Sequence, residues 1–253
     1  MSPRTWWIFV AVGGGIAGSL YYFRTRNIGP VERGARVAHA VGCFTCHGAG
    51  GAHGIPDPGH ALGDVPTWNG GLLTMYVDNE GEIAEWILDG MPARIRKDKD
   101  QQRARADAKI LMPAFRSVLS ASEARDLVAY VKAVAGYEKP DDLKAAEGME
   151  LAEKTGCFGC HGPEGRGNPE NPRSLKGYIP SWSGRDFPDL AQNDAEIRDW
   201  VLKGGTPRLE SNGLARFFLG RQVLSMPAYD GALKPDEVDR VLDYIHWLRR
   251  NPD

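Results

Sequence analysis

Two five-residue motifs in this chain contain the residue types that attach and ligate a haem. Residues Cys43 to His47 read CFTCH, and residues Cys157 to His161 read CFGCH. The spacing Cys-x-x-Cys-His is the attachment signature of c-type haem. Two copies predict two covalently attached haems, with the histidines as proximal iron ligands. The predicted attachment residues are Cys43, Cys46, Cys157 and Cys160, and the predicted proximal ligands are His47 and His161.

Cysteine pairs of this spacing also occur in zinc sites and in redox dithiols. A redox dithiol needs one pair and no following histidine. A zinc site of four thiolates would use both pairs, which lie 114 residues apart and each carry a histidine of their own. All four cysteines of the chain belong to the two motifs, so none is left for a structural disulfide. Haem attachment is therefore the favoured interpretation.

The second half of the chain repeats the first at this offset of 114 residues. The offset relates Met112-Pro113-Ala114 to the same three residue types at 226–228. It also relates six further pairs, namely Pro66 and Pro180, Trp68 and Trp182, Glu82 and Glu196, Trp86 and Trp200, Gly90 and Gly204, and Tyr130 and Tyr244. A repeat of this length without gaps predicts two tandem copies of one domain.

The repeat also indicates the second axial ligand of each haem. Of the six methionines, Met112 and Met226 are at equivalent positions, each 65 residues after its haem histidine. A thioether sulfur is a common axial ligand of haem iron, and identical placement in both copies argues against simple core filling. Met91 also precedes a proline and is an alternative ligand for the first haem. Its equivalent, Gly205, has no side chain to bind iron.

Each half resembles a class I cytochrome c domain. The family pattern is an N-terminal helix, Cys-x-x-Cys-His, a loop, a short helix, a methionine loop and a C-terminal helix, and all parts occur twice within residues 30–253. The tandem arrangement is similar to di-haem carriers of the cytochrome c4 type and to membrane-tethered di-haem subunits of some bacterial cytochrome bc complexes. The resemblance implies an all-α fold with domains at 30–136 and 141–253, joined by the linker 137–140.

The resemblance also suggests residues that surround the haem histidines. In the family, a proline carbonyl accepts a hydrogen bond from the histidine Nδ1–H and fixes the ring. Pro58 and Pro172 occupy equivalent positions after the two motifs and are predicted to do this. Trp68 and Trp182 are also equivalent, and their indole N–H groups are suited to donate to haem propionates. Simple packing is the alternative for both tryptophans.

Helix signals occur between the motifs where the family pattern requires them. Amphipathic periodicity and capping residues predict four helices, over 30–41, 120–134, 141–155 and 235–249. Two further short helices are predicted to begin at capping boxes, one formed by Asn79 and Glu82 and the other by Asn193 and Glu196.

Residues Trp6 to Phe23 form a run of 18 uncharged residues. As a helix this run would span roughly 27 Å, close to the hydrocarbon thickness of a bilayer. We expect a transmembrane anchor within residues 1–29, and a cleaved signal peptide is the alternative. Gly14 and Gly18 would lie on one face of this helix and let it pack closely against integral membrane subunits.

The resemblance also implies where the protein is located. Because c-type haem is attached outside the cytoplasm in this family, we expect a single-pass protein of the bacterial cytoplasmic (inner) membrane. Both haem domains would then lie on the periplasmic side.

The formal net charge of −2 gives no support for nucleic-acid binding. Between residues 94 and 109 the chain carries seven basic and three acidic side chains. This basic segment is interpreted as a solvated loop or as a docking surface for acidic partners or anionic lipids. Its basic residues are Arg94, Arg96, Lys97, Lys99, Arg103, Arg105 and Lys109.

Histidine and methionine together close both axial positions of a haem iron, which leaves electron transfer rather than substrate chemistry. The sequence predicts a non-enzymatic subunit of a respiratory or photosynthetic complex. It would relay single electrons from a quinol-oxidising core to a soluble cytochrome, an oxidase or a reaction centre. The alternatives are a free-standing tethered carrier and a di-haem peroxidase, in which His53 or His60 would replace Met112 or act on the distal side.

Overall fold

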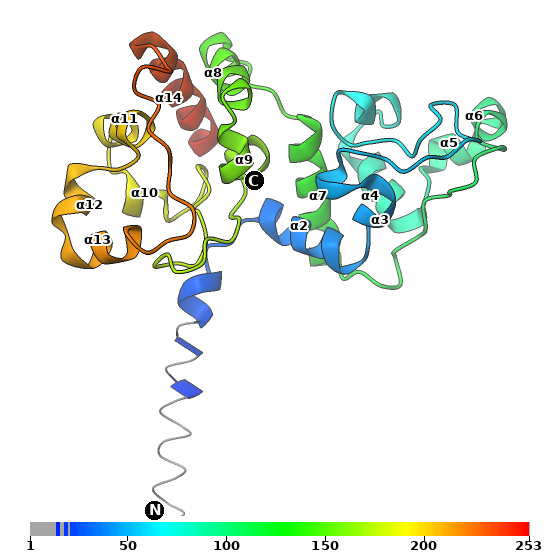
Figure 1. Ribbon diagram of the computed structural model, residues 1–253. Helices are drawn as coiled ribbons and strands as arrows, with labels where there is room; N and C mark the ends of the chain where they lie inside the picture. The colour runs from blue at the N-terminus through cyan, green and yellow to red at the C-terminus, as the bar shows by residue number, and fades with distance from the viewer. Residues whose placement is uncertain (1–13, 16–17, 20, 253) are drawn as a thin grey trace, which may run out of the picture.

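The computed structural model describes residues 14–15, 18–19 and 21–252. These residues form two helical domains that lie side by side, and residues 21–29 lead into the region between them (Figure 1). In the described part of the chain, strand-like pairing is limited to three isolated bridges. Two of these bridges, Pro56 with Asp64 and Glu170 with Tyr178, are at equivalent positions of the repeat. The predicted helical architecture with two tandem domains is confirmed.

The first domain contains eight helical elements among the described residues. They are α2 (Pro30–Ala40), α3 (Phe44–His47), η1 (Ala49–Gly51), η2 (Leu72–Met75), α4 (Glu80–Asp89), α5 (Ala93–Lys97), α6 (Lys99–Ala104) and α7 (Ala121–Ala135).

The second domain repeats this order with small differences in length. Its elements are α8 (Leu143–Lys154), α9 (Cys157–His161), η3 (Pro163–Gly165), α10 (Phe187–Leu190), α11 (Asp194–Lys203), α12 (Pro207–Ser211), α13 (Gly213–Leu219) and α14 (Pro235–Arg250).

In each domain the first helix packs against the last, α2 on α7 and α8 on α14. The helices approach closely because a glycine lies at each crossing. A Cβ atom on Gly34 would come within 1.9 Å of the Asp126 carbonyl oxygen, and one on Gly148 within 1.9 Å of the Arg240 carbonyl oxygen. The last helices bury the apolar faces predicted from their periodicity, including Leu127 in α7. This crossing forms the core that supports each haem motif.

The predicted helix caps are present. Asn79 accepts a hydrogen bond from the Glu82 backbone N–H at 3.3 Å, and Asn193 does the same for Glu196 at 3.1 Å. The Glu82 carboxylate in turn accepts from the Asp78 backbone N–H at 2.9 Å, so the pair satisfies donors at the start of α4.

The predicted transmembrane helix over Trp6–Phe23 is wrong for the structure described. In the residues that the structure describes, no helix has both the length and the apolar character needed to cross a membrane. Much of the predicted segment, residues 6–13, 16–17 and 20, lies outside the described residues. Among the described residues, the helical residues 21–25 include the charged Arg24, whereas a membrane span requires about 18 continuous apolar residues. The fold is corrected to two tandem helical domains.

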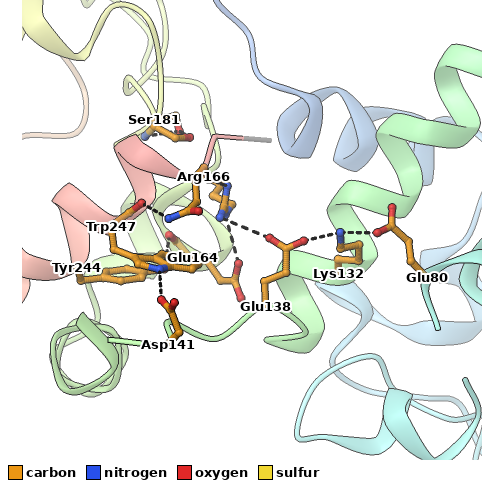
Figure 2. Close-up of polar contacts among 11 residues, drawn as sticks. Glu80, Lys132, Glu138, Asp141, Glu164, Arg166, Ser181, Tyr244 and Trp247 are labelled. Carbon is orange, nitrogen blue, oxygen red and sulfur yellow. Dashed lines mark hydrogen bonds and ion pairs between the residues drawn. The ribbon is translucent and has the colours of Figure 1, made fainter. Parts of the chain in front are cut away.

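A series of ion pairs joins the two domains through the linker (Figure 2). Glu138 in the linker lies 2.5 Å from the Lys132 ammonium and 3.7 Å from a guanidinium nitrogen of Arg166. Lys132 also pairs with Glu80 at 2.8 Å. Because Lys132 belongs to α7 and Arg166 follows η3, one linker carboxylate couples charges from both domains.

Arg166 is only 2% exposed, which is rare for an arginine. Its Nε lies 3.4 Å from the Glu164 carboxylate, and its Nη1 donates to the Asn251 carbonyl at 3.2 Å. The guanidinium also lies 5.9 Å from the centroid of the Trp247 ring. Several partners thus compensate for the desolvation of this buried charge.

The start of the first domain is tied directly to the second. Gly29, which precedes α2, donates its backbone N–H to Asn168 Oδ1 at 2.9 Å. The Asn168 backbone N–H donates to the Glu32 carboxylate at 3.4 Å. Asn168 is fully buried. These bonds, together with the ion pairs at the linker, define the interface between the domains.

Candidate functional site

The two Cys-x-x-Cys-His motifs occupy the same local structure. Cys43 is the N-cap of α3 and His47 ends that helix, while Cys157 and His161 are the first and last residues of α9. The four cysteines form no disulfide with one another. Burial raises the pKa of the Cys43 and Cys157 thiols, which disfavours the thiolates that zinc needs. Nowhere in the described chain do three or more His, Cys, Asp or Glu side chains gather as they would around a metal ion.

The ring of His47 is held by a backbone carbonyl. Its Nδ1 lies 2.9 Å from the carbonyl oxygen of Pro66. Burial lowers the pKa of His47, so the ring is neutral at physiological pH. With Nδ1–H donated to Pro66, the lone pair on Nε2 is available to bind a metal.

The carbonyl at His47 therefore belongs to Pro66 and not to Pro58, so the prediction for Pro58 is corrected. Pro58 is exposed in the turn that follows Asp57. Pro66 reaches the histidine because Trp68, two residues later, donates its backbone N–H to the Gly51 carbonyl at 2.8 Å. That bond draws the segment back over the haem motif.

In the second domain, burial lowers the pKa of His161 to about 4. Its Nδ1 is buried and has no hydrogen-bond partner among the described residues. The carbonyl of Pro172, predicted to hold this ring, instead accepts from the Val223 backbone N–H at 3.1 Å. The prediction for Pro172 is thus corrected as well, and Pro180 is the residue equivalent to Pro66.

Trp68 and Trp182 pack against the two histidines in the same way. Each indole centroid lies 4.9 Å from the centroid of its imidazole. Both tryptophans are buried, and each covers a glycine with positive φ, Gly51 at 79° and Gly165 at 73°. A Cβ atom at Gly51 would come within 2.1 Å of the Trp68 ring. Packing is thus one role of these tryptophans, and hydrogen bonding to propionates stays a prediction.

A cavity of about 460 Å³ lies in the first domain, beside the haem motif. Cys43, Cys46 and His47 line it together with Met112. Most of the remaining wall is apolar, and its aliphatic side chains include Val65, Leu73, Ile83, Ile87, Leu127 and Val131. Two thiols, a neutral imidazole and a thioether around an apolar cavity suit a flat macrocycle that is bonded at one edge and ligated on both faces. The residues present therefore fit a c-type haem.

The loop that carries each methionine is hydrogen-bonded to the end of the short helix before it. Phe115 donates its backbone N–H to the Ile87 carbonyl at 3.1 Å, and Tyr229 donates to the Val201 carbonyl at 3.0 Å. Gly90 ends α4 in the left-handed conformation, with φ of 73°. A Cβ atom there would come within 2.5 Å of the Met112 carbonyl oxygen. The repeated glycine is thus needed for close approach of the methionine loop.

Asp57 and its equivalent Asn171 hold the same loop from the other side, and sequence reasoning missed both. The Asp57 carboxylate accepts from the backbone N–H groups of Lys109 at 3.0 Å and Ile110 at 3.1 Å, two to three residues before Met112. Asn171 accepts from the Leu224 backbone N–H at 2.9 Å, two residues before Met226. The available signal was that both copies of the repeat have a polar residue at this position. It was missed because the residue is aspartate in one copy and asparagine in the other.

Two further candidate ligands line the same cavity as Met112. Met91 and His60 are both half-buried there. His53 is exposed and is not among the lining residues. Met91 and His60 thus remain alternatives at the first haem. Met226 is partly buried against the core of the second domain.

Comparison with known proteins gives the family. The family model for cytochrome c matches residues 31–135 and 145–249. A curated relative, the cbb3-type cytochrome c oxidase subunit FixP of Azorhizobium caulinodans, is 31% identical over 177 residues, which make up 69% of this chain and 53% of the relative. The chain thus spans about half the length of that relative. No solved structure matches the chain.

The repeated attachment motif, the cavity beside it and the two family matches agree on one assignment. The chain belongs to the cytochrome c family and has two tandem domains that carry two c-type haems.

Proposed function

We propose that this protein is an electron-transfer subunit of a terminal oxidase complex, which accepts single electrons and passes them on through its two haems. The observation that carries the proposal is the cavity of the first domain, which has His47 and Met112 among its lining residues. The same residues recur in the second domain as His161 and Met226. The name of the relative supports an oxidase as the complex.

We assign His47 and Met112 as the axial ligands of the first haem, and His161 and Met226 as those of the second. Cys43 with Cys46, and Cys157 with Cys160, would form the thioether bonds to the two haems. When bound, each haem supplies an iron centre that gains and loses one electron. Ligation of each iron by a histidine and a methionine would leave no open position for a substrate, so the chemistry would be electron transfer.

The surrounding residues limit movement when the charge on the iron changes. Pro66 fixes the His47 ring through Nδ1, and Trp68 packs against that ring. Asp57 holds the backbone just before Met112. A site whose ligands are already in place reorganises little on electron transfer, because its supporting shell is rigid.

The interface between the domains supports a relay. Glu138 contacts charged groups of both domains, and Asn168 bonds to Gly29 and Glu32. These contacts hold the two haem domains in one arrangement, so the electron path between the haems has a fixed length. The electrons would come from a quinol-oxidising core or a reduced soluble cytochrome, on the periplasmic side of the membrane.

Spectroscopy of the purified full-length protein tests the proposed ligands. We expect the ferric protein to show a sulfur-to-iron charge-transfer band from both haems, and we expect carbon monoxide not to bind the reduced protein. Replacing Met112 by Ala should remove the band of one haem, and replacing Met226 by Ala the band of the other. Met91→Ala is the matched control and should change neither band.

Carbon monoxide binding to the unaltered protein would contradict this assignment and favour the peroxidase alternative. The oxidase association is tested separately, by purification from the native source in mild detergent. Recovery with the catalytic subunit of an oxidase is the expected result. Recovery of the chain alone would instead support a free-standing carrier.

A further inference from the structure

The cavity of the first domain has an arginine on its wall that the haem motif does not explain. Arg105 follows α6 directly, is half-buried and lines the cavity. Its guanidinium lies 4.8 Å from the ring centroid of Trp86 and 5.2 Å from that of Tyr76. Both aromatic residues line the cavity too. The Trp86 indole is itself fixed, since it donates to the Tyr76 carbonyl at 3.2 Å. The cation is thus positioned by two aromatic rings.

Arg105 differs from its neighbours in having no carboxylate partner among the described residues. Arg103, two residues earlier, pairs with Asp100 at 2.6 Å. Arg94 pairs with Glu82 at 2.7 Å. A guanidinium has five N–H donors, and those of Arg105 donate to no acceptor in the described part of the protein. Burial lowers the pKa of Arg105, but an arginine remains charged at neutral pH.

Other charged groups at this cavity do not cancel the charge of Arg105. Asp89 lines the cavity, but its carboxylate is occupied by Arg116 at 2.7 Å. Arg96 adds a second positive charge, and its guanidinium donates to the Met91 carbonyl at 2.8 Å. The charge that the protein presents to the first cavity is therefore positive.

The second domain has no cation at this position. The residue equivalent to Arg105 is Leu219, and that equivalent to Tyr76 is Leu190, whereas Trp86 is retained as Trp200. The equivalence is structural as well as numerical, because Asp98 and Asn212 cap α6 and α13 at the same repeat position. The Arg105 charge and the Tyr76 ring beside it are thus specific to the first domain, whereas the tryptophan occurs in both.

We propose that Arg105 is a positioning and tuning residue that raises the reduction potential of the first haem. This inference rests on the proposed histidine and methionine ligation. Ferric iron carries one more positive charge than ferrous iron, so a fixed cation beside the haem disfavours the ferric form. At an effective dielectric constant of about 20, one charge acting over roughly 10 Å changes such an equilibrium by about tenfold. The second haem lacks this contribution.

Spectroelectrochemical titration of the full-length protein tests the proposal. Arg105→Leu copies the second domain and should lower the reduction potential of one haem. The equilibrium constant for its reduction should fall about tenfold, which corresponds to ~59 mV for one electron. Arg105→Lys keeps the charge and should restore most of the shift. The reciprocal variant Leu219→Arg should raise the potential of the other haem and leave the first unchanged.

Arg103→Leu is the matched control, because Arg103 lies in α6 two residues before Arg105 but its side chain is 76% exposed. It should move neither potential. Equal shifts in Arg105→Leu and Arg105→Lys would show that packing, not charge, is responsible. Unchanged potentials in Arg105→Leu, or in Leu219→Arg if the former does not fold, would overturn the proposal. The sulfur-to-iron band of the unaltered protein is the independent check. Its absence would refute the proposed methionine ligation, which is a different failure from that of the Arg105 proposal.

Discussion

The loops that follow the two haem motifs run through the same backbone positions but carry different side chains. In the first domain, residues 50, 52 and 54 are Gly, Ala and Gly, and in the second domain the equivalent residues are Glu164, Arg166 and Asn168. Gly51 and Gly165 have positive φ in both loops, and each accepts the backbone N–H of its tryptophan. The path that holds the histidine is thus common to both copies.

What differs between the loops lies at the domain interface. Arg166 contacts the linker and Asn168 bonds to the start of the first domain. Glu164 has a positive φ of 54°, which is unfavourable for a residue other than glycine. The comparison teaches that haem binding constrains the backbone of this loop, while its side chains are free to form an interface in one copy.

A similar distinction applies to the helix crossing. Arg33 pairs with Asp126 at 2.7 Å in the first domain, and at the equivalent positions Glu147 pairs with Arg240 at 2.9 Å. The signs of the two charges are reversed between the copies. The crossing requires opposite charges at this place but not a particular order, whereas the glycine at its centre is present in both.

The largest expected effect comes from filling the helix crossing. Gly34→Val places atoms where the Asp126 carbonyl oxygen already lies, so α2 and α7 must move apart. We expect a loss of more than about 3 kcal/mol in the free energy of unfolding of the first domain, measured by calorimetry. Gly148→Val should act equally on the second domain. Gly213→Ala, where the added Cβ meets open space, should be nearly neutral.

A smaller effect is expected from the buried arginine of the second loop. Arg166→Ala leaves Glu164 buried without its nearest cation and should cost about 2–3 kcal/mol in chemical denaturation. The double variant Glu164→Gly with Arg166→Ala copies the first loop and should regain much of that loss. If the double variant is as unstable as the single one, the two loops are not interchangeable and our comparison fails.

The methionine loops are expected to differ in their response to acid. Backbone N–H groups of Lys109, Ile110 and Gly59, that of Lys109 above all, hold the pKa of Asp57 below its usual range. A depressed pKa means that Asp57 stabilises the loop above about pH 3.9, its ordinary pKa, and that this stabilisation is lost as the pH falls through the lowered value.

Acid titration of the sulfur-to-iron bands between pH 5 and 2 measures this difference. The band of the first haem should weaken as the pH falls, in part because Asp57 becomes protonated. Asp57→Asn should remove that part of the pH dependence. The second domain has Asn171 at this position, so no such contribution is expected there. An acid response of the first haem that is identical in the protein and in Asp57→Asn would contradict the role given to this carboxylate.

The smallest effect is expected at the linker. Glu138→Gln weakens its contacts with Lys132 and Arg166, and because Glu138 is 47% exposed the expected cost is about 1 kcal/mol or less. The more informative measurement is the distance distribution between spin labels on the two domains. We expect it to broaden in Glu138→Gln and to stay narrow in Glu147→Gln, which removes an ion pair within one domain.

Much of the fold was predictable because its signals are local and occur twice. Proline at the start of α2, the asparagine caps of α4 and α11 and the apolar faces of α7 and α14 can all be read from neighbouring residues. The prediction of a transmembrane helix was wrong for the described chain, where no helix is long and apolar enough to cross a membrane.

The surroundings of the haem motifs were harder to predict. Pro58 and Pro66 are both prolines at repeated positions after the first motif, and spacing does not tell which one folds back to His47. Asp57 contacts backbone groups more than 50 residues away, and its equivalent is a different residue type. Such contacts depend on the path of the whole loop.

The sequence by itself determined that two haems are attached, that the chain is a tandem repeat and where most helices begin, because covalent chemistry and helix formation depend on residues close together in the chain. Only the tertiary structure decided that Pro66 holds His47, that Arg105 lies at the first cavity and that Arg166 is buried against the linker. These features arise from side chains distant in sequence, and their energies depend on burial and on charged partners that packing brings together.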